Sequence, residues 1–302
     1  MKRFVGLILF FIAVTTHAQI EGAVTGNHWV GTWATAQQPV VWSFMPYNNN
    51  MSGRSVRQIV KVSIGGKQLR LELSNELSRE PLVIRSVYIA HATDSCAIEP
   101  SSAKYLKFNG NYNTVIPAGK SRFSDALTFD LQPLERLAIT INYDKAPRIP
   151  TVHMGSRTTS YILRGVSTPK TSFDKAFRED HWFNISAIDV FDLTAKSIAI
   201  IGNSITDGKN STNNAQNRWP DILSESLQKK HGVTDVGILN LGIGNNRVTL
   251  TGGFGFMARK RFDHDILLQR GVRTVVIFEG VNDIGATPNN KVETVTNDLI
   301  QS

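Results

Sequence analysis

The feature that most constrains the fold of this chain is a change in hydrophobic periodicity near residue 192. Before that point apolar and polar residues alternate, as at 60–64, 69–73 and 137–143, and residues 82–90 predict a further strand. Alternation with period two is typical of strands that bury one face. Several short strands separated by turn residues predict an antiparallel, all-β sandwich over residues 27–192, jelly-roll-like in topology. We also expect 60–64 and 69–73 to pair as a hairpin across Gly65-Gly66.

After Asp192 short apolar runs alternate with segments of helical periodicity. The runs occupy 197–201, 236–241 and 274–278. Unbroken runs of this length are typical of strands that are buried on both faces. Helices are expected from Trp219 onward, over 256–269 and over 292–300. The alternation predicts an α/β three-layer parallel sheet over 197–302, apparently truncated after its third strand.

The N-terminus predicts export. Lys2 and Arg3 precede an apolar stretch at 4–14, and Thr16-His17-Ala18 places small residues where a signal peptidase cuts. We therefore expect residues 1–18 to be a signal peptide. Because this stretch is shorter than the roughly 20 residues that span a bilayer, and none elsewhere is longer, no membrane span is expected in the mature chain. The single cysteine, Cys96, excludes a disulfide framework.

The positive charge does not indicate a nucleic-acid partner. The chain has 33 Lys and Arg residues against 25 Asp and Glu residues, but they are spread along its length. The longest basic run is Arg259-Lys260-Arg261, and aromatic residues do not interleave with it. A solvated basic surface is the expected arrangement.

Polar loops follow each of the three predicted parallel strands. They are Gly202-Asn203-Ser204-Ile205-Thr206-Asp207-Gly208, residues 240–247 and residues 279–285. Ligands of open α/β sheets bind at the carboxyl ends of strands, so the three loops should meet at one site. Ser204 lies near an expected helix start, where free backbone N–H groups and the helix dipole stabilise a developing oxyanion. A serine beside loops that offer amide donors is what acyl transfer requires.

Each loop also has a simpler interpretation when it is taken alone. Ser204 fits a helix N-cap, and Asn282-Asp283 fit an ordinary turn. A dinucleotide-binding loop at Gly242-x-Gly244 is disfavoured, because Arg247 stands where the third glycine is needed.

Taken together, the three loops resemble the motif blocks of the SGNH (GDSL) hydrolase superfamily. The resemblance begins near residue 197 and continues to the end of the chain. The stretch from Trp29 to Thr35 is similar to the opening of a secreted esterase subgroup that carries an N-terminal β-sandwich. The resemblance implies an SGNH hydrolase domain at 197–302 that acts on esters without a metal or organic cofactor.

The resemblance also implies roles for individual residues. Ser204 would be the nucleophile. The oxyanion hole would comprise the N–H groups of Ser204 and Asn245 and the side-chain amide of Asn282. Support of the site loops would fall to the following residues: Gly202, Asn203, Asp207, Gly280 and Asp283.

Three departures from the family pattern matter. Asn203 replaces the usual Asp, with a mild expected effect on loop geometry. Asn245 replaces the usual glycine, and Asn tolerates positive φ better than most residues. The C-terminal Asp-x-x-His block that supplies the general base is missing, and His264 is expected on a surface helix. Loss of the base costs on the order of 10⁶ in turnover, which leaves about 10³ over water. We therefore expect either a fragment of a longer enzyme, which we favour, or an inactive chain.

Two functional hypotheses follow. The first is an exported esterase or lipase that uses a Ser204 acyl-enzyme on O-acyl esters of carbohydrates, such as an acylated polysaccharide, or on other short-chain esters. The second is a non-catalytic secreted carbohydrate-binding protein with a degenerate hydrolase domain.

Overall fold

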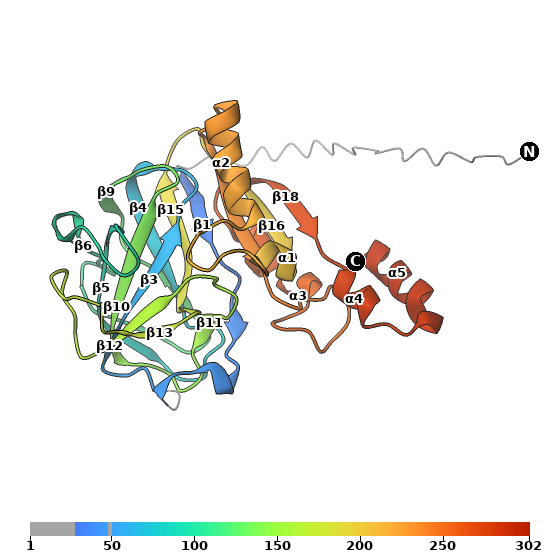
Figure 1. Cartoon of the computed structure of the whole chain (residues 1–302), viewed down its shortest axis with the longest axis horizontal. Helices are drawn as coiled ribbons and strands as arrows, with labels where there is room; N and C mark the ends of the chain where they lie inside the picture. The colour runs from blue at the N-terminus through green and yellow to red at the C-terminus, as the bar shows by residue number, and fades with distance from the viewer. Residues whose placement is uncertain (1–27, 48–49) are drawn as a thin grey trace, which may run out of the picture.

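The structure is a computed structural model that describes residues 28–47 and 50–302. The predicted signal peptide, residues 1–18, lies outside the described residues. A β-rich body built from the N-terminal region packs beside a smaller region, from which α4 (Val281–Gly285) and α5 (Val292–Gln301) project (Figure 1). In the described part of the chain, no helix is long and apolar enough to cross a membrane.

The β-rich body contains two large antiparallel sheets and a small one. The first sheet contains β1 (Trp29–Ala34), β15 (Ile185–Phe191), β4 (Gly66–Ser74), β8 (Ser121–Phe123) and β9 (Leu127–Leu131). The second contains β13 (Phe177–Glu179), β12 (Ser160–Arg164), β3 (Arg54–Lys61), β10 (Arg136–Lys145), β5 (Leu82–His91), β6 (Lys104–Tyr105) and β7 (Thr114–Ile116). The small sheet contains β14 (Trp182–Phe183), β11 (Thr151–His153) and β2 (Gln38–Pro39). Short 3₁₀ turns occur at η1 (Trp42–Phe44) and η3 (Pro100–Ser102).

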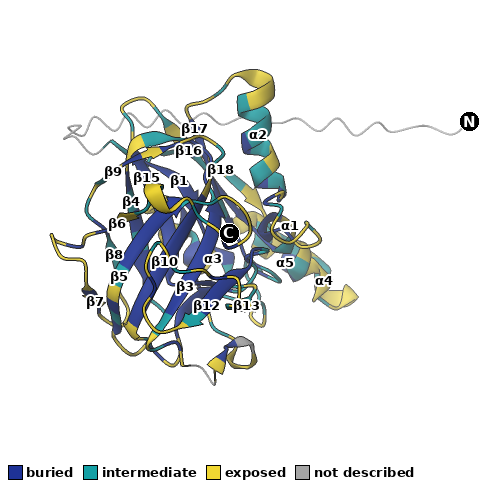
Figure 2. Cartoon of the chain, turned by 60° about the vertical axis from the view of Figure 1, so that its left-hand side comes forward, coloured by how far each residue is buried: buried dark blue, intermediate teal, exposed yellow. Residues whose placement is uncertain are grey.

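The apolar faces of the two large sheets share one core. Leu69 and Leu71 of β4 belong to the same buried cluster as Ile139 and Ile141 of β10, and none is more than 1% exposed. Figure 2 shows the buried strands running through this body. The β-rich N-terminal region predicted from period-two alternation is confirmed.

The predicted hairpin across Gly65-Gly66 is wrong. β3 pairs with β10 and β12, whereas β4 pairs with β15, β8 and β9, so the two strands belong to different sheets. Between them the chain crosses the sandwich, and Thr32 of β1 fixes the crossing: its Oγ1 donates to Ile64 O at 2.6 Å and its carbonyl accepts from Ser63 N–H. The crossing places the two apolar runs in different sheets, from which both contribute to one core.

The C-terminal region contains a three-stranded parallel sheet in the order β17–β16–β18. β16 (Lys196–Gly202) lies between β17 (Val236–Gly242) and β18 (Val272–Phe278). The last residue of β16, Gly202, is in register with Gly242 and with Phe278. The carboxyl ends of the three strands therefore meet at one edge.

The two faces of this sheet are covered differently. On one face Leu223 and Leu227 of α2 (Trp219–His231) pack against Ile200 and Ile238. On the other face the buried cluster includes residues of β1 and of α3 (Ala258–Phe262). A strand of the sandwich thus takes much of the place where a second helical layer was expected.

Two further elements differ from expectation. The helix expected over 256–269 is α3 followed by a π-helical turn, η4 (Asp263–Leu267). β18 is more exposed than a doubly covered strand, with Ile277 65% exposed. A 3₁₀ turn, η5 (Asn289–Lys291), precedes α5.

Candidate active site

The three motif loops converge on one cleft at the carboxyl edge of the parallel sheet. α1 (Ser204–Asp207) follows β16, a long loop follows β17, and α4 follows β18. Ser204, Asn245 and Asn282 line the same cleft, which has a volume of about 460 Å³. We call it the strand-end cleft. It brings together the three residues that sequence patterns proposed for acyl transfer.

Ser204 begins a single helical turn whose N-cap is Asn203. The Asn203 Oδ1 accepts from Ile205 N–H at 3.0 Å, and its Nδ2 donates to Phe278 O at 3.3 Å. An Asp at this position could not make the second hydrogen bond, so Asn203 ties the turn that carries Ser204 to β18. Among the described residues, neither Oγ nor the backbone N–H of Ser204 has a hydrogen-bond partner. Because α1 spans only four residues, these free groups matter here rather than a helix dipole.

The loop after β17 is held by side chains from both neighbouring motif loops. Asp207 Oδ2 accepts from Gly244 N–H at 2.7 Å. The buried Asp283 carboxylate accepts from three consecutive backbone N–H groups at 2.9–3.1 Å, those of residues 248–250. Asn282 Nδ2 donates to Asn246 O at 2.9 Å. The expected loop-supporting residues Asp207 and Asp283 therefore contact the loop that carries Asn245.

Three residues that carry amide donors, Ser204, Asn245 and Asn282, line the cleft. Asn245 adopts φ 52°, so the expectation that Asn accommodates this left-handed position is confirmed. Within the described chain its N–H has no acceptor. Asn282 uses one hydrogen of its amide on Asn246 O and keeps the other, and Gly280 begins α4 with φ 99°. Unpaired, oriented donors beside a serine are what stabilises an oxyanion.

Arg261 is a buried part of the site that sequence reasoning missed. It was predicted to lie in a solvated basic run, but it is 4% exposed. Its guanidinium donates to Leu241 O at 2.7 Å and to Asp265 at 2.6 Å, and it reaches Gly202 O at 3.3 Å. It therefore connects the ends of β16 and β17 beneath the cleft. The Asp four residues later was the only available signal.

Glu279 lies beside Arg261 with its side chain 1% exposed. The distance from its Oε1 to Arg261 Nη2 is 3.6 Å. Burial raises the pKa of the Glu279 carboxyl to about 7, although the nearby Arg261 opposes the rise.

The sandwich forms the opposite wall of the strand-end cleft, which was also not anticipated. Gln38, Met154, Arg157 and His181 line it. The His181 Nδ1 lies 2.8 Å from Met154 O, and its Nε2 lies 3.1 Å from Glu179 Oε1. In the described part of the chain, no hydrogen bond joins Ser204 Oγ to a histidine.

His264 does not line the cleft. It is partly exposed on η4, with Nδ1 2.7 Å from Asp265 and Nε2 3.0 Å from Glu76 of the sandwich. Hydrogen bonds to Asp265 and Glu76 raise its pKa to about 10.

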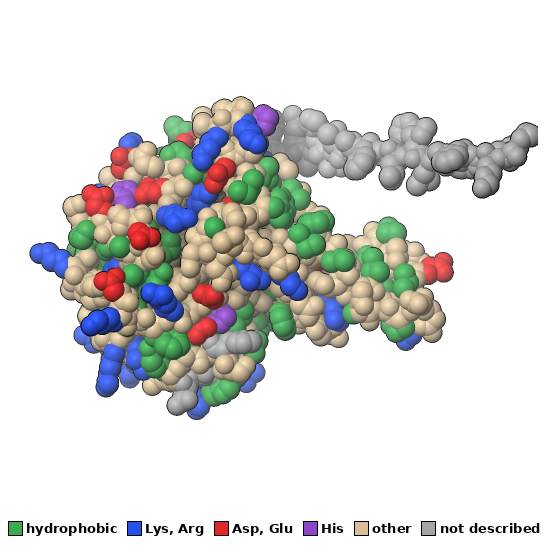
Figure 3. Space-filling model, viewed as in Figure 1, with side chains coloured by type: hydrophobic (Ala, Val, Ile, Leu, Met, Phe, Trp, Pro, Cys, Tyr) green, Lys and Arg blue, Asp and Glu red, His purple; other side chains and the backbone are tan. Residues whose placement is uncertain are grey.

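The described residues contain no cluster of three His, Cys, Asp or Glu side chains that could hold a metal ion. On the face of the molecule seen in Figure 3, basic side chains are scattered among acidic and apolar ones.

The chain was compared with known protein families, curated proteins and solved structures. No curated protein matches the chain. Among solved structures it is similar to an acetyl xylan esterase (Est2A) from the rumen bacterium Butyrivibrio proteoclasticus, with 12% sequence identity and a TM-score of 0.21. That match covers 85% of this chain, which spans 61% of the esterase. The family description that matches residues 200–300 is the GDSL-like Lipase/Acylhydrolase family. The region that builds the strand-end cleft therefore belongs to the SGNH/GDSL hydrolases.

Proposed function

We propose that the chain is an exported serine ester hydrolase in which Ser204 forms an acyl-enzyme. The observation that carries the proposal is the convergence of Ser204, Asn245 and Asn282 on one cleft from three separate strand ends. The predicted signal peptide supports export.

In the proposed reaction Ser204 Oγ attacks the ester carbonyl carbon while its proton passes to a general base. The oxyanion accepts hydrogen bonds from the N–H groups of Ser204 and Asn245 and from Asn282 Nδ2. Collapse breaks the bond to the alcohol, which leaves with a proton, and water then releases the acid and regenerates Ser204. No metal or organic cofactor takes part.

The lining of the cleft favours a small acyl group on a polar alcohol. Gln38, Arg157, Lys209 and Asn245 present polar groups to it, against two large apolar side chains, Met154 and Phe254. A cleft of about 460 Å³ lies in the range of sites for small ligands. These features support O-acyl carbohydrates as substrates over long-chain lipids.

The test supplies a base from outside. Imidazole is small enough to enter the cleft and can take the proton of Ser204 Oγ. We expect imidazole to accelerate hydrolysis of p-nitrophenyl acetate by the wild-type chain. The acceleration should be at least ten times that seen with Ser204→Ala, because a general base contributes about 10²–10⁴ to the rate. In the presence of imidazole, a fluorophosphonate should label the peptide that contains Ser204. Ser226→Ala, a half-buried serine on α2, is the matched control and should behave as wild type.

Equal imidazole-assisted rates in wild type and Ser204→Ala would reject the nucleophile assignment. One observation favours an alternative, a non-catalytic carbohydrate-binding protein: among the described residues, no histidine forms a hydrogen bond with Ser204 Oγ. That function predicts no labelling of Ser204 together with retention of the chain on insoluble acetylated xylan.

A further inference from the structure

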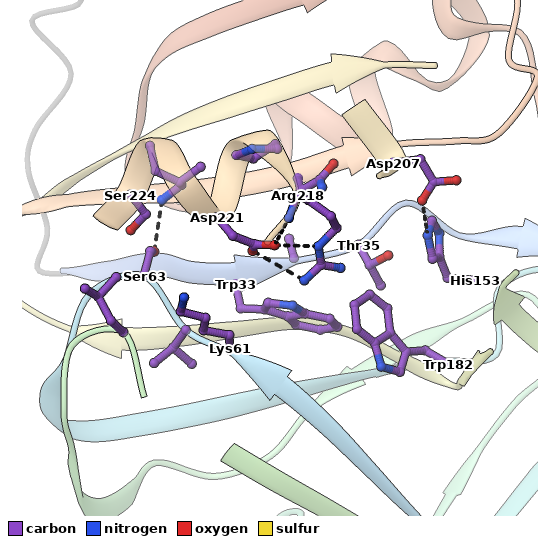
Figure 4. A pocket seen from close by; sticks show the side chains of 16 residues that line it. Trp33, Thr35, Lys61, Ser63, His153, Trp182, Asp207, Arg218, Asp221 and Ser224 are labelled. Atoms are coloured by element: carbon purple, nitrogen blue, oxygen red, sulfur yellow. Dashed lines mark hydrogen bonds and ion pairs between the residues drawn. The ribbon is translucent and has the colours of Figure 1, made fainter. Parts of the chain in front are cut away.

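A continuous set of hydrogen bonds links the sandwich to the loop that carries Asn245. His153 ends β11 in the sandwich, and its Nδ1 lies 2.8 Å from Ala36 O. Its Nε2 lies 2.9 Å from Asp207 Oδ1. The second oxygen of that carboxylate accepts from Gly244 N–H at 2.7 Å. Figure 4 shows His153 and Asp207 facing each other at the boundary between the two regions.

This link is enclosed by protein. His153 is 3% exposed and Asp207 is 7% exposed. The His153 ring lies 5.7 Å from the ring of Trp182. Gly155 packs against the carboxylate so closely that a Cβ there would lie 2.1 Å from Asp207 Oδ2. Gly155 therefore confines the carboxylate on the side of the sandwich.

The hydrogen-bond donors can be counted from the contacts. Nδ1 faces a carbonyl oxygen, so it must carry a hydrogen. Nε2 faces a carboxylate oxygen, and two lone pairs cannot bond, so a proton must also lie between His153 and Asp207. Without His153, a buried carboxylate would be left with the Gly244 N–H and without its charge-assisted partner. A carboxylate in that state is costly and will reorient towards water.

We propose that His153 is a positioning residue for the strand-end cleft: by holding Asp207, it fixes the turn at Gly244 from which the Asn245 N–H projects. In this arrangement the sandwich is part of the site, since it orients an oxyanion donor from a different region of the chain. The kinetic consequence rests on the function proposed above. The effect on loop mobility does not.

The primary test is amide hydrogen exchange of the full chain, followed on peptides that cover residues 242–247. In His153→Ala we expect exchange in this segment to rise about tenfold or more, the effect of losing a hydrogen bond to a charged group. In His153→Gln we expect most of the protection to return, because the Gln amide reaches as far as Nε2 and can donate to Asp207. His91→Ala is the matched control. His91 also pairs with a carboxylate, that of Glu135, but within the sandwich alone, so its loss should leave 242–247 unchanged.

The second readout is kinetic. In the imidazole-assisted assay His153→Ala should lower kcat about tenfold or more with little change in KM. The substitution weakens the hydrogen bond from the Asn245 N–H to the oxyanion, which forms in the transition state and not when the ester binds. If the Ala variant does not fold, His153→Asn, whose amide is too short to reach Asp207, takes its place against His153→Gln.

The proposal is overturned if exchange at 242–247 is unchanged in a folded His153→Ala chain, or if it rises equally in His91→Ala. Equal exchange in His153→Asn and His153→Gln would also overturn it. A wild-type chain with no Ser204-dependent chemistry would reject the proposed function, while the exchange comparison would still decide the role of His153.

Discussion

At the scale of single residues, three asparagines shape this site, and two of them, Asn203 and Asn245, replace residue types expected from the family pattern. Asn203 replaces an expected Asp and gains a donor to Phe278 O. Asn245 replaces an expected glycine and adopts φ 52°. Asn282 is oriented by its bond to Asn246 O. Each substitution keeps the backbone geometry that the cleft needs, since Asn is small, tolerates left-handed φ and offers both donor and acceptor.

Removing the Asn282 amide should weaken the oxyanion hole. We expect Asn282→Ala to lower the imidazole-assisted kcat by about 10²–10³, the value typical of one lost oxyanion donor. Asn213→Ala is a suitable control. Asn213 Nδ2 donates an exposed hydrogen bond to Asp180 Oδ2 at 3.0 Å, and Asn213 does not line the strand-end cleft. If Asn282→Ala lowers the imidazole-assisted kcat by less than threefold, Asn282 does not donate to the oxyanion.

The buried Glu279 predicts a pH-dependent stability. Its folded pKa, about 7, exceeds its ordinary value of 4.5, so the folded chain keeps a proton that the unfolded chain releases between these values. Stability should therefore fall as pH rises from about 4.5 to about 7, by about 3 kcal/mol at most. Glu279→Gln should remove this fall. Urea unfolding of both chains at pH 5 and pH 7.5 measures the difference, and parallel pH profiles would contradict the prediction.

At the scale of elements, β1 has two roles. It is the edge strand of the first sandwich sheet, paired with β15, and it also covers the parallel sheet. Gly31 N–H donates to Arg270 O at 2.9 Å, and Gly31 O accepts from Ser197 Oγ at 2.8 Å. Its backbone approaches β17 so closely that a Cβ on Gly237 would lie 2.2 Å from Gly31 O. Along β1 the two regions therefore touch through backbone atoms.

The close approach makes Gly237→Ala a sensitive substitution. The methyl group would meet rigid backbone, so β1 and β17 must separate, and we expect a loss of about 1–3 kcal/mol in unfolding free energy. Gly285→Ala is the matched control, because a Cβ at Gly285 meets nothing within 4 Å. Chemical denaturation of both variants tests this. Equal stability of the two variants would show that β1 adapts without strain.

At the scale of the whole molecule, polar contacts join the sandwich to the C-terminal region. Lys61 pairs with Glu225 of α2, and His264 pairs with Glu76. Arg218, at the start of α2, donates to Ser156 O at 3.3 Å and lies over the Trp182 ring. These contacts tie the sandwich to α2 and η4, and the strand-end cleft has walls from both regions, so loosening the boundary will also alter the cleft.

The His264 contact predicts a second pH effect, at alkaline pH. Its folded pKa, about 10, lies above the ordinary 6.5, so its contribution is complete below about pH 6.5 and is lost as pH rises through about 10. Because the side chain is 45% exposed, screening limits the contribution to about 1 kcal/mol or less. The stability difference between wild type and His264→Gln should therefore shrink from pH 6 to pH 10.5, and further in high salt. A difference independent of pH would contradict the pairing.

The sequence by itself determined the local elements and the chemistry of the loops. Period-two alternation predicted the strands that became β4 and β10, and unbroken apolar runs predicted those that became β16 and β17. Residue types at the strand ends made Ser204 and Asn282 candidate site residues, because parallel strands bring their carboxyl ends to one edge.

Only the tertiary structure decided which segments meet. Alternation shows which face of a strand is buried but not which strand lies beside it, so β3 and β4 were paired wrongly. For the same reason Arg261 was taken for a surface residue, and His153 gave no signal. Burial of a charged side chain depends on partners far away in the chain, such as Asp207 for His153, which lies 54 residues later. Such partners are set by packing of the sandwich against the parallel sheet, which no local pattern records.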